Sequence, residues 1–237
     1  MRHALISLVL LGACAPNGDE GILVTKNVVP GAGCSFVGDI SEGFFPDGQW
    51  SSTASTGYLF HPQMQSRITA LPGEENERTI VIQAANVDLT VDSSLGLNLD
   101  DGLLHFKAPF SVPLPPIVGG TLTSADGEFQ LIPPEIVDAV VAANPTAGQP
   151  AGPGNPTFST LIQASFVVVG KMSGNDVTSQ PFVYGVTLSN NVVVQEAGPC
   201  PVTTGTVAPG NPCNPFQDGL VTCCTTGNAL VCPAPMM

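Results

Sequence analysis

The fold is decided by the stretch Phe158-Ser159-Thr160-Leu161-Ile162-Gln163-Ala164-Ser165-Phe166-Val167-Val168-Val169-Gly170. Its even positions are apolar apart from Thr160 and Gly170, so they form one row. A second stretch, residues 182–194, repeats the pattern with the even positions Phe182, Tyr184, Val186, Leu188, Val192 and Val194. Successive strand residues point to opposite faces, so each stretch predicts a strand with one buried face. The polar segment 171–181 between them predicts an antiparallel pair at the centre of a sandwich core.

Residues 78–92 also alternate, but their phase changes along the stretch. Ile80 and Ile82 fall on even positions, whereas Val87 and Leu89 fall on odd ones. A one-residue slip sends side chains to the opposite face, so the pattern predicts either a β-bulge near residues 84–86 or two strands that meet there. We favour the bulge.

Shorter signals fill in the rest of the domain. Residues 21–29, 58–60 and 68–71 predict strands, and prolines mark 105–114 as an edge strand. Asp126-Gly127 predicts a tight hairpin between 121–122 and 129–132. Residues 38–57 predict a long loop anchored by Trp50. Pro133-Pro134 predicts one helix over about 134–143 that ends before Pro145 and packs through its valines and Ile136.

Strands at these intervals with mostly non-helical connections predict an all-β fold, an Ig-like antiparallel β-sandwich. Glycine (26) and proline (23) are abundant, charged residues make up only 11% and hydrophobic residues 43% of the 237 positions, which is typical of a packed, turn-rich protein. The chain has 19 acidic and 6 basic residues and no basic run, which argues against a nucleic-acid partner.

The N-terminus carries a targeting signal. Arg2 precedes an apolar run, residues 4–11, that is well short of the roughly 20 residues a membrane-spanning helix needs. Leu11-Gly12-Ala13-Cys14 resembles the lipobox of bacterial lipoprotein precursors. The resemblance implies that residues 1–13 are a signal peptide, that Cys14 is acylated and N-terminal in the mature protein, and that Ala15 directs it to the outer membrane. Residues 14–21 then predict a short acidic tether, and the partner implied is the membrane, through covalent lipid.

The cysteine count agrees with that expectation. Of the seven cysteines, six remain if Cys14 carries lipid, and an even number in an oxidising compartment predicts three disulfides rather than a metal site. These six are Cys34, Cys200, Cys213, Cys223, Cys224 and Cys232. Adjacent Cys223 and Cys224 have Cα atoms about 3.8 Å apart, too close for a usual disulfide, so they predict two different partners. The other pairings stay open among fifteen, with Cys34 and Cys200 as one candidate pair.

The expected domains are therefore the sandwich over 22–197 and a cysteine-rich C-terminal segment over 198–237. That segment is too poor in large apolar groups to build its own core and needs crosslinks to hold a shape.

The sequence offers few groups for chemistry. His61 and His105 have no ligand-spaced neighbours, and no G-x-S-x-G elbow is present. An oxygen-rich cluster is a candidate calcium site, although its spacing matches no EF-hand. Its members are Asp88, Asp92, Asn98, Asp100 and Asp101. The same residues equally fit the solvent face of a strand. No cofactor is expected.

The leading hypothesis is a non-enzymatic outer-membrane lipoprotein that acts as a binding, scaffolding or envelope-assembly module, with another envelope protein as a partner. The alternative is an envelope hydrolase acting on carbohydrate or peptide, with acids such as Glu42, Asp47 or Glu135 brought together by folding. A third reading makes the C-terminal segment an inhibitor-like or carbohydrate-binding knot, for which Phe216 is its one aromatic residue.

Overall fold

The computed structural model describes residues 20–31, 34–35, 43–54, 56–152, 154–191, 194–203, 205–208, 210–211, 213–227, 229–232 and 234. The strands of the N-terminal half are β1 (Glu20–Val28), β2 (Phe44–Phe45), β3 (Gly48–Ser51), β4 (Tyr58–Phe60), β5 (Pro62–Ser66), β6 (Thr69–Ala70), β7 (Ile80–Val91), β8 (His105–Leu114) and β9 (Ile117–Val118). Those that follow are β10 (Ser124–Asp126), β11 (Phe129–Ile132), β12 (Ser159–Met172), β13 (Asn175–Ser179), β14 (Phe182–Ser189), β15 (Val194–Pro199), β16 (Val221–Thr226) and β17 (Ala229–Val231). The helices are α1 (Glu75–Arg78), α2 (Asp101–Leu104) and α3 (Pro134–Ala143), with 3₁₀ turns at Ser93–Leu95 and Pro145–Gly148.

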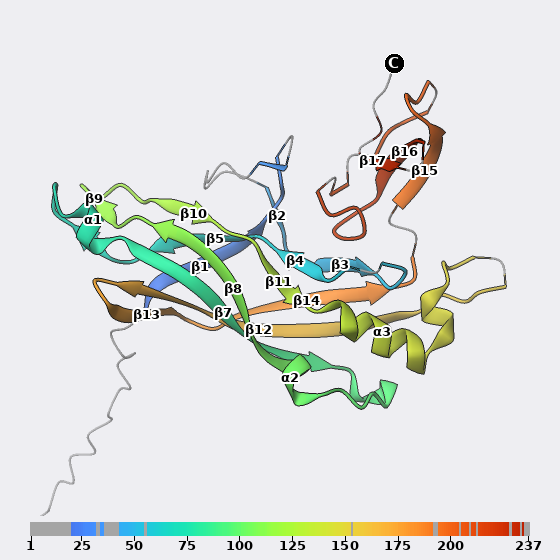
Figure 1. Ribbon diagram of the computed structural model, residues 1–237, viewed down its shortest axis with the longest axis horizontal. Coiled ribbons are helices and arrows are strands. Elements are labelled where there is room, and N and C mark those ends of the chain that lie inside the picture. The colour runs from blue at the N-terminus through green and yellow to red at the C-terminus, as the bar shows by residue number, and fades with distance from the viewer. Residues whose placement is uncertain are drawn as a thin grey trace, which may run out of the picture.

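Strand β12 is the centre of the large sheet (Figure 1). It pairs antiparallel with β7 along one side and, along the other, first with β14 and then with β13. Phe166 lies opposite Phe182 on β14 and opposite Val87 on β7. The predicted antiparallel pair is therefore confirmed over 159–166 and 182–189, and so is the burial of its even positions from Ile162 to Val168.

The ends of that pair differ from the prediction. The second strand stops at Ser189, Val192 lies outside the described residues, and Val194 belongs to β15. The polar connection is itself a strand, β13, which turns back through Ser173 and Gly174, both with positive φ, to pair with the end of β12. Its alternation is too short to show in the sequence, because only Val177 and Ser179 are buried.

From β13 the sheet continues through β1 and β5 to β10, and from β14 it continues to β3. It folds over, so that β8 lies beside β10 and β11, while β4 and β11 form a second small sheet. Helix α3 buries Ile136, Val137 and Val140 against the same core. The all-β sandwich and its helix at 134–143 are thus confirmed, although β1 with β13 and β3 with β14 pair parallel rather than antiparallel.

Aromatic side chains fill the space between the layers. Phe60 on β4 packs against Phe129, Phe166 and Tyr184, with ring centroids 5.7, 5.1 and 4.9 Å away. Edge-to-face and offset ring pairs add to the free energy gained from burying their area. This cluster joins the small sheet to the faces of β12 and β14.

Strand β7 confirms the bulge. It is one continuous strand in which both Ala84 and Ala85 are buried, so the inward phase switches between them. Its pairing with β8 and with β12 slips between Ile82 and Ala84.

Two local expectations are wrong. Residues 38–57 are not only a loop, because β3 lies within them and pairs with β14, although Trp50 is the buried anchor expected. The 121–132 segment forms no hairpin. Ser124–Asp126 pairs with β5 and Phe129–Ile132 pairs with β4, so the two strands continue in one direction past Gly127. Long-range partners outcompeted the local Asp-Gly turn signal.

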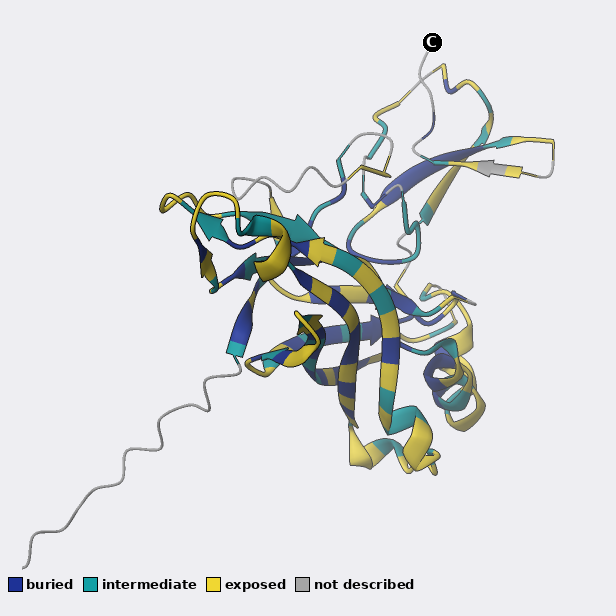
Figure 2. Ribbon diagram, turned by 60° about the vertical axis from the view of Figure 1, so that its left-hand side comes forward, coloured by how far each residue is buried: buried dark blue, intermediate teal, exposed yellow. Residues whose placement is uncertain are grey.

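The C-terminal segment forms a separate small module at one end of the molecule (Figures 1 and 2). Its sheet runs β15-β16-β17, and among the described residues its own cluster has three buried members, Val202, Cys224 and Ala234. Its first strand, β15, starts at Val194.

Disulfides hold this module, as expected. Cys200 pairs with Cys224 and Cys223 with Cys232, so the neighbouring cysteines do bond to different partners. The suggested Cys34–Cys200 pair is wrong, because Cys34 pairs with Cys213 instead. Cys34 and Cys200 flank the sandwich in the sequence, but that position did not make them partners. Residues 213–218 run along the sandwich instead, and Cys213 at their start meets Cys34.

Candidate functional site

The segment Cys213–Asp218 crosses from the C-terminal module to the sandwich and covers the open edges of β3 and β4. Ser51 N donates to the Phe216 carbonyl, and Asp218 N donates to the Gln49 carbonyl. The Gln217 side chain makes two hydrogen bonds with the backbone of Leu59, at 3.0 and 2.8 Å. These bonds satisfy strand-edge groups that would otherwise remain open for pairing with another chain.

Asp218 is the centre of a buried polar cluster beneath this segment. Its Oδ1 accepts from the Tyr58 hydroxyl at 2.7 Å and from Gln49 N at 3.1 Å. Asn27 Nδ2 donates to the hydroxyls of Tyr58 and Tyr184, at 3.3 and 2.9 Å. Gly48 is needed here, because a Cβ at that position would lie 2.7 Å from the Tyr58 hydroxyl oxygen.

Burial shifts the proton equilibria of this cluster. It raises the pKa of Asp218 to about 6, although the hydrogen bonds from Tyr58 and Gln49 act in the opposite direction. Burial also raises the pKa of Tyr184 to about 12 and places the pKa of Tyr58 well above its ordinary value. The cluster therefore keeps both phenols protonated at neutral pH, while Asp218 changes charge in mildly acidic solution.

A carboxyl group with a raised pKa is a frequent sign of a functional site, although structural networks produce it too. Here Asp218 is only 7% exposed, and its second oxygen accepts from Gln217 Nε2 at 3.1 Å. Asp218 lines none of the four clefts described below. The cluster joins the sandwich to the C-terminal segment, and we call its residues Asn27, Tyr58, Tyr184 and Asp218 the latch.

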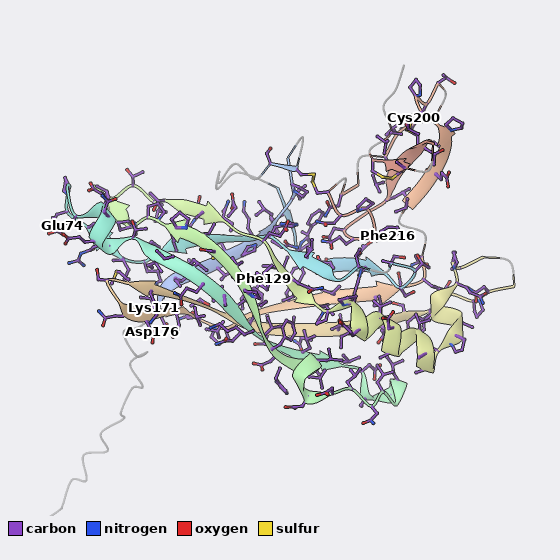
Figure 3. All side chains as sticks on the ribbon, in the orientation of Figure 1. Glu74, Phe129, Lys171, Asp176, Cys200 and Phe216 are labelled. Atoms are coloured by element: carbon purple, nitrogen blue, oxygen red, sulfur yellow. A yellow bond between two sulfur atoms is a disulfide. The ribbon has the colours of Figure 1, made fainter. Side chains whose placement is uncertain are left out.

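Two clefts adjoin the latch, and both are lined by Phe216, the side chain labelled in Figure 3. The larger, of about 240 Å³, is mainly apolar and includes Trp50, Leu59 and Pro215. The smaller, of about 120 Å³, lies toward Pro150 and Asn190. An apolar lining that includes half-buried Pro215 and Phe216 suits a peptide or protein segment rather than a charged metabolite.

Two further clefts lie elsewhere on the sandwich. One, lined by Phe106, Pro109 and Pro133, sits between β8 and β11, and the other lies where the 92–104 loop leaves β7. None of the four clefts is lined by two carboxylates.

His61 and His105 have different surroundings. His61 is buried, and desolvation lowers its pKa to about 4, so the ring is neutral although Glu128 Oε2 lies 3.5 Å from its Nδ1. Its Nε2 is 3.2 Å from Asn214 Nδ2, which makes it another contact of the 213–218 segment. His105 is exposed beside Asp88, whose hydrogen bond raises the pKa of the imidazole.

Four of the candidate calcium ligands contact other protein groups. Asp88 contacts His105 at 2.7 Å, whereas Asp92 accepts from Ser94 N and Asp100 accepts from Gly102 N. Asp101 lies 3.6 Å from the other nitrogen of His105. Across the described residues, no group of three or more histidine, cysteine, aspartate or glutamate side chains is placed to hold a metal ion.

Two of the three acids proposed for hydrolysis, Asp47 and Glu135, are among the described residues. Glu42 lies outside the described residues. Asp47 is exposed before β3, and Glu135 is exposed in the first turn of α3. Neither lines any of the four clefts.

Cys14 and its lipobox fall outside the described residues. In the part of the chain that the structure describes, no helix has the length and apolar character needed to cross a bilayer.

Sequence reasoning missed the latch. Tyr58 and Tyr184 were expected as strand residues, and Asp218 stands in a glycine-rich stretch with no motif. The one available signal was that these are the chain's two tyrosines, whose hydroxyls need partners when buried.

Comparisons with known proteins add little. No family model matches the chain, and no curated protein matches it. Among solved structures, a crystal structure of a protein from Archaeoglobus fulgidus aligns with a TM-score of 0.33 and 8% identity, covering 60% of this chain and 91% of that one.

Proposed function

We propose that this protein is an outer-membrane-anchored lipoprotein that acts as a non-enzymatic binding, scaffolding or envelope-assembly module. Its membrane contact is covalent lipid on Cys14, and its partner is a second protein of the envelope. The sequence Leu11-Gly12-Ala13-Cys14 carries the proposal, because two or three acyl chains on one cysteine are enough for stable anchoring.

The path of the chain supports this anchoring. Strand β1 begins at Glu20, six residues after Cys14. Six extended residues span roughly 20 Å at most, so a lipid on Cys14 would hold the sandwich close to the bilayer surface.

The placement of the two ends supports a display role. The start of β1 lies at the opposite end of the molecule from the C-terminal module in Figure 1. An anchored molecule would therefore present the module and the clefts beside Phe216 toward its surroundings. Phe216 is half-buried and joins both clefts, which is the arrangement of an aromatic anchor at an interface.

The anchor is tested by intact mass and detergent partitioning of the wild type and Cys14→Ser. We expect the wild type to carry the mass of attached acyl chains and to partition into detergent, and the variant to do neither. Equal partitioning of the two proteins, or a wild type without acyl mass, would end the lipoprotein proposal.

The binding role is tested by crosslinking and capture of the acylated protein from intact envelopes. We expect one protein to be retained by the wild type and lost with Phe216→Ser. The matched control is Phe44→Ser, which removes an aromatic side chain that is 56% exposed on β2. Loss of the captured protein in both variants would contradict a site at Phe216.

A further inference from the structure

We propose that two uncharged loop tips beside the start of β1 dock into the surface of a zwitterionic lipid bilayer. The tips are residues 71–73 and 119–122, and the inference rests on the proposed lipid anchor at Cys14. Docking would fix the orientation of the sandwich, which would rest on the membrane through this end instead of moving freely on its tether.

The tips are held side by side by strand pairing. Strands β6 and β9 pair parallel, with Ala70 opposite Val118, and each tip follows directly after its strand. The two tips are therefore neighbours, although about fifty positions separate them in the chain.

Both tips expose leucine. Leu71 is 68% exposed, the largest exposed fraction among the large hydrophobic side chains of the described residues, and Leu122 is 55% exposed. The other residues of the tips are Pro72, Gly73, Gly119, Gly120 and Thr121, all exposed and uncharged. Exposed apolar side chains on protruding turns gain free energy when they enter the boundary between headgroups and acyl chains.

The tips also lie next to the point where the anchored chain enters the fold. Arg67 N donates to the Gly21 carbonyl, and Ile68 packs against Gly21. Ile117 N in turn donates to the Ile68 carbonyl. Leu71 is three residues beyond Ile68, about 10 Å at full extension, so lipid on Cys14 and the two leucines can reach one surface together.

The charges around the tips favour a zwitterionic bilayer over an anionic one. Glu74 and Glu75 fold back on the first tip and accept hydrogen bonds from the backbone of Leu71 and Gly73, at 3.4 and 2.9 Å. Basic and acidic side chains form pairs nearby, such as Lys171 with Asp176 (Figure 3). Carboxylates at headgroup depth are repelled by anionic lipids, whereas a zwitterionic lipid carries no net charge that would repel them.

The docking is tested on the mature chain from Cys14, with its thiol coupled to a maleimide lipid that has one acyl chain. The three disulfides occupy the other six cysteines, so the coupling is specific. One chain binds bilayers only marginally, which leaves the contribution of the tips measurable. We expect Leu71→Ser with Leu122→Ser to weaken binding to phosphatidylcholine vesicles at least tenfold.

The matched control is Leu161→Ser with Val183→Ser, which removes side chains 57% and 55% exposed on the outer face of β12 and β14. We expect it to change vesicle affinity less than twofold. In a second measurement, Leu122→Trp should show blue-shifted emission and quenching by lipids brominated in their acyl chains, whereas Val183→Trp should show neither. Trp50, the native tryptophan, is buried and supplies a constant background.

Equal affinity of the two double variants, or a water-exposed emission from Leu122→Trp on vesicles, would overturn the docking surface. Stronger binding to phosphatidylglycerol vesicles would overturn the zwitterionic preference. Because the lipid is supplied chemically, a failure of docking is distinct from a failure of acylation, which the mass of the natural protein reports.

Discussion

The sandwich and the C-terminal module are built from one chain by different means. The sandwich encloses a continuous cluster of buried residues contributed by its strands and α3, whereas the module's own cluster has three buried members among the described residues, Val202, Cys224 and Ala234. The module instead has two disulfides within about forty residues. Where a segment is too small or too polar to bury apolar area, crosslinks that restrict the unfolded chain replace the missing hydrophobic free energy.

The latch at Asp218 depends neither on apolar burial, as the sandwich does, nor on a crosslink within the module. It joins the two regions through hydrogen bonds from Tyr58 and Gln49, and the Cys34–Cys213 disulfide fixes the start of the same segment. The comparison therefore predicts three different responses: to a lost core side chain, to a lost crosslink and to pH.

The largest expected effect is in the sandwich core. Phe166→Ala should lower the free energy of unfolding by about 3–5 kcal/mol, because the ring is 1% exposed and packs against Phe60, Phe129 and Phe182. Urea unfolding measures it, with Ser165→Ala on the outer face as the control at less than about 0.5 kcal/mol. Equal losses at the two positions would contradict the register.

Removal of a module crosslink should have a smaller and local effect. Cys200→Ala with Cys224→Ala opens a loop of 24 residues, for which the chain-entropy model gives about 3 kcal/mol. We expect hydrogen exchange to rise in β15–β17 while the amides of β12 keep their protection. If the main unfolding midpoint fell as far as in Phe166→Ala, the module would be part of the sandwich's cooperative unit.

The third effect is the pH dependence of the latch. The pKa of Asp218 rises from 3.8 to about 6 on folding, so between those values the native state binds a proton that the unfolded state has lost. The contribution of the protonated Asp218 to the free energy of unfolding is fully present below pH 4 and is lost as pH rises toward 6. The loss is at most about 1.4 kcal/mol per pH unit.

Asp218→Asn should therefore be less sensitive to pH than the wild type between pH 4 and 6 in chemical unfolding. Asp138→Asn on the exposed face of α3 controls for the loss of one charge elsewhere. Parallel curves for the wild type and Asp218→Asn would show that Asp218 titrates normally.

Strong periodicity made the core predictable. The even rows of β12 and β14, the phase change of β7 and the helix opened by Pro134 are all confirmed, because each depends on which face of one element is buried. Short elements were missed for the opposite reason. Strands β3, β5 and β13 are short, and polar residues such as Ser51, Gln63 and Ser179 occupy buried positions in them, so they show no apolar alternation. Strands β3 and β5 also depend on partner strands far away in the chain.

The site was less predictable than the fold. The sequence identified the six disulfide cysteines and separated Cys223 from Cys224 by a local distance. It did not indicate the latch, because Tyr58, Tyr184 and Asp218 are far apart in the chain and match no motif. The acylation of Cys14 stays a prediction.

By itself the sequence determined the fold class, the central strand pair and its buried face, because side-chain alternation is a local property that survives any packing arrangement. Tertiary structure alone decided which strand edge the 213–218 segment covers and which cysteine bonds to Cys34. It also decided that the pKa of Asp218 is raised. Those outcomes depend on long-range packing and desolvation, and neither exists until the chain has folded.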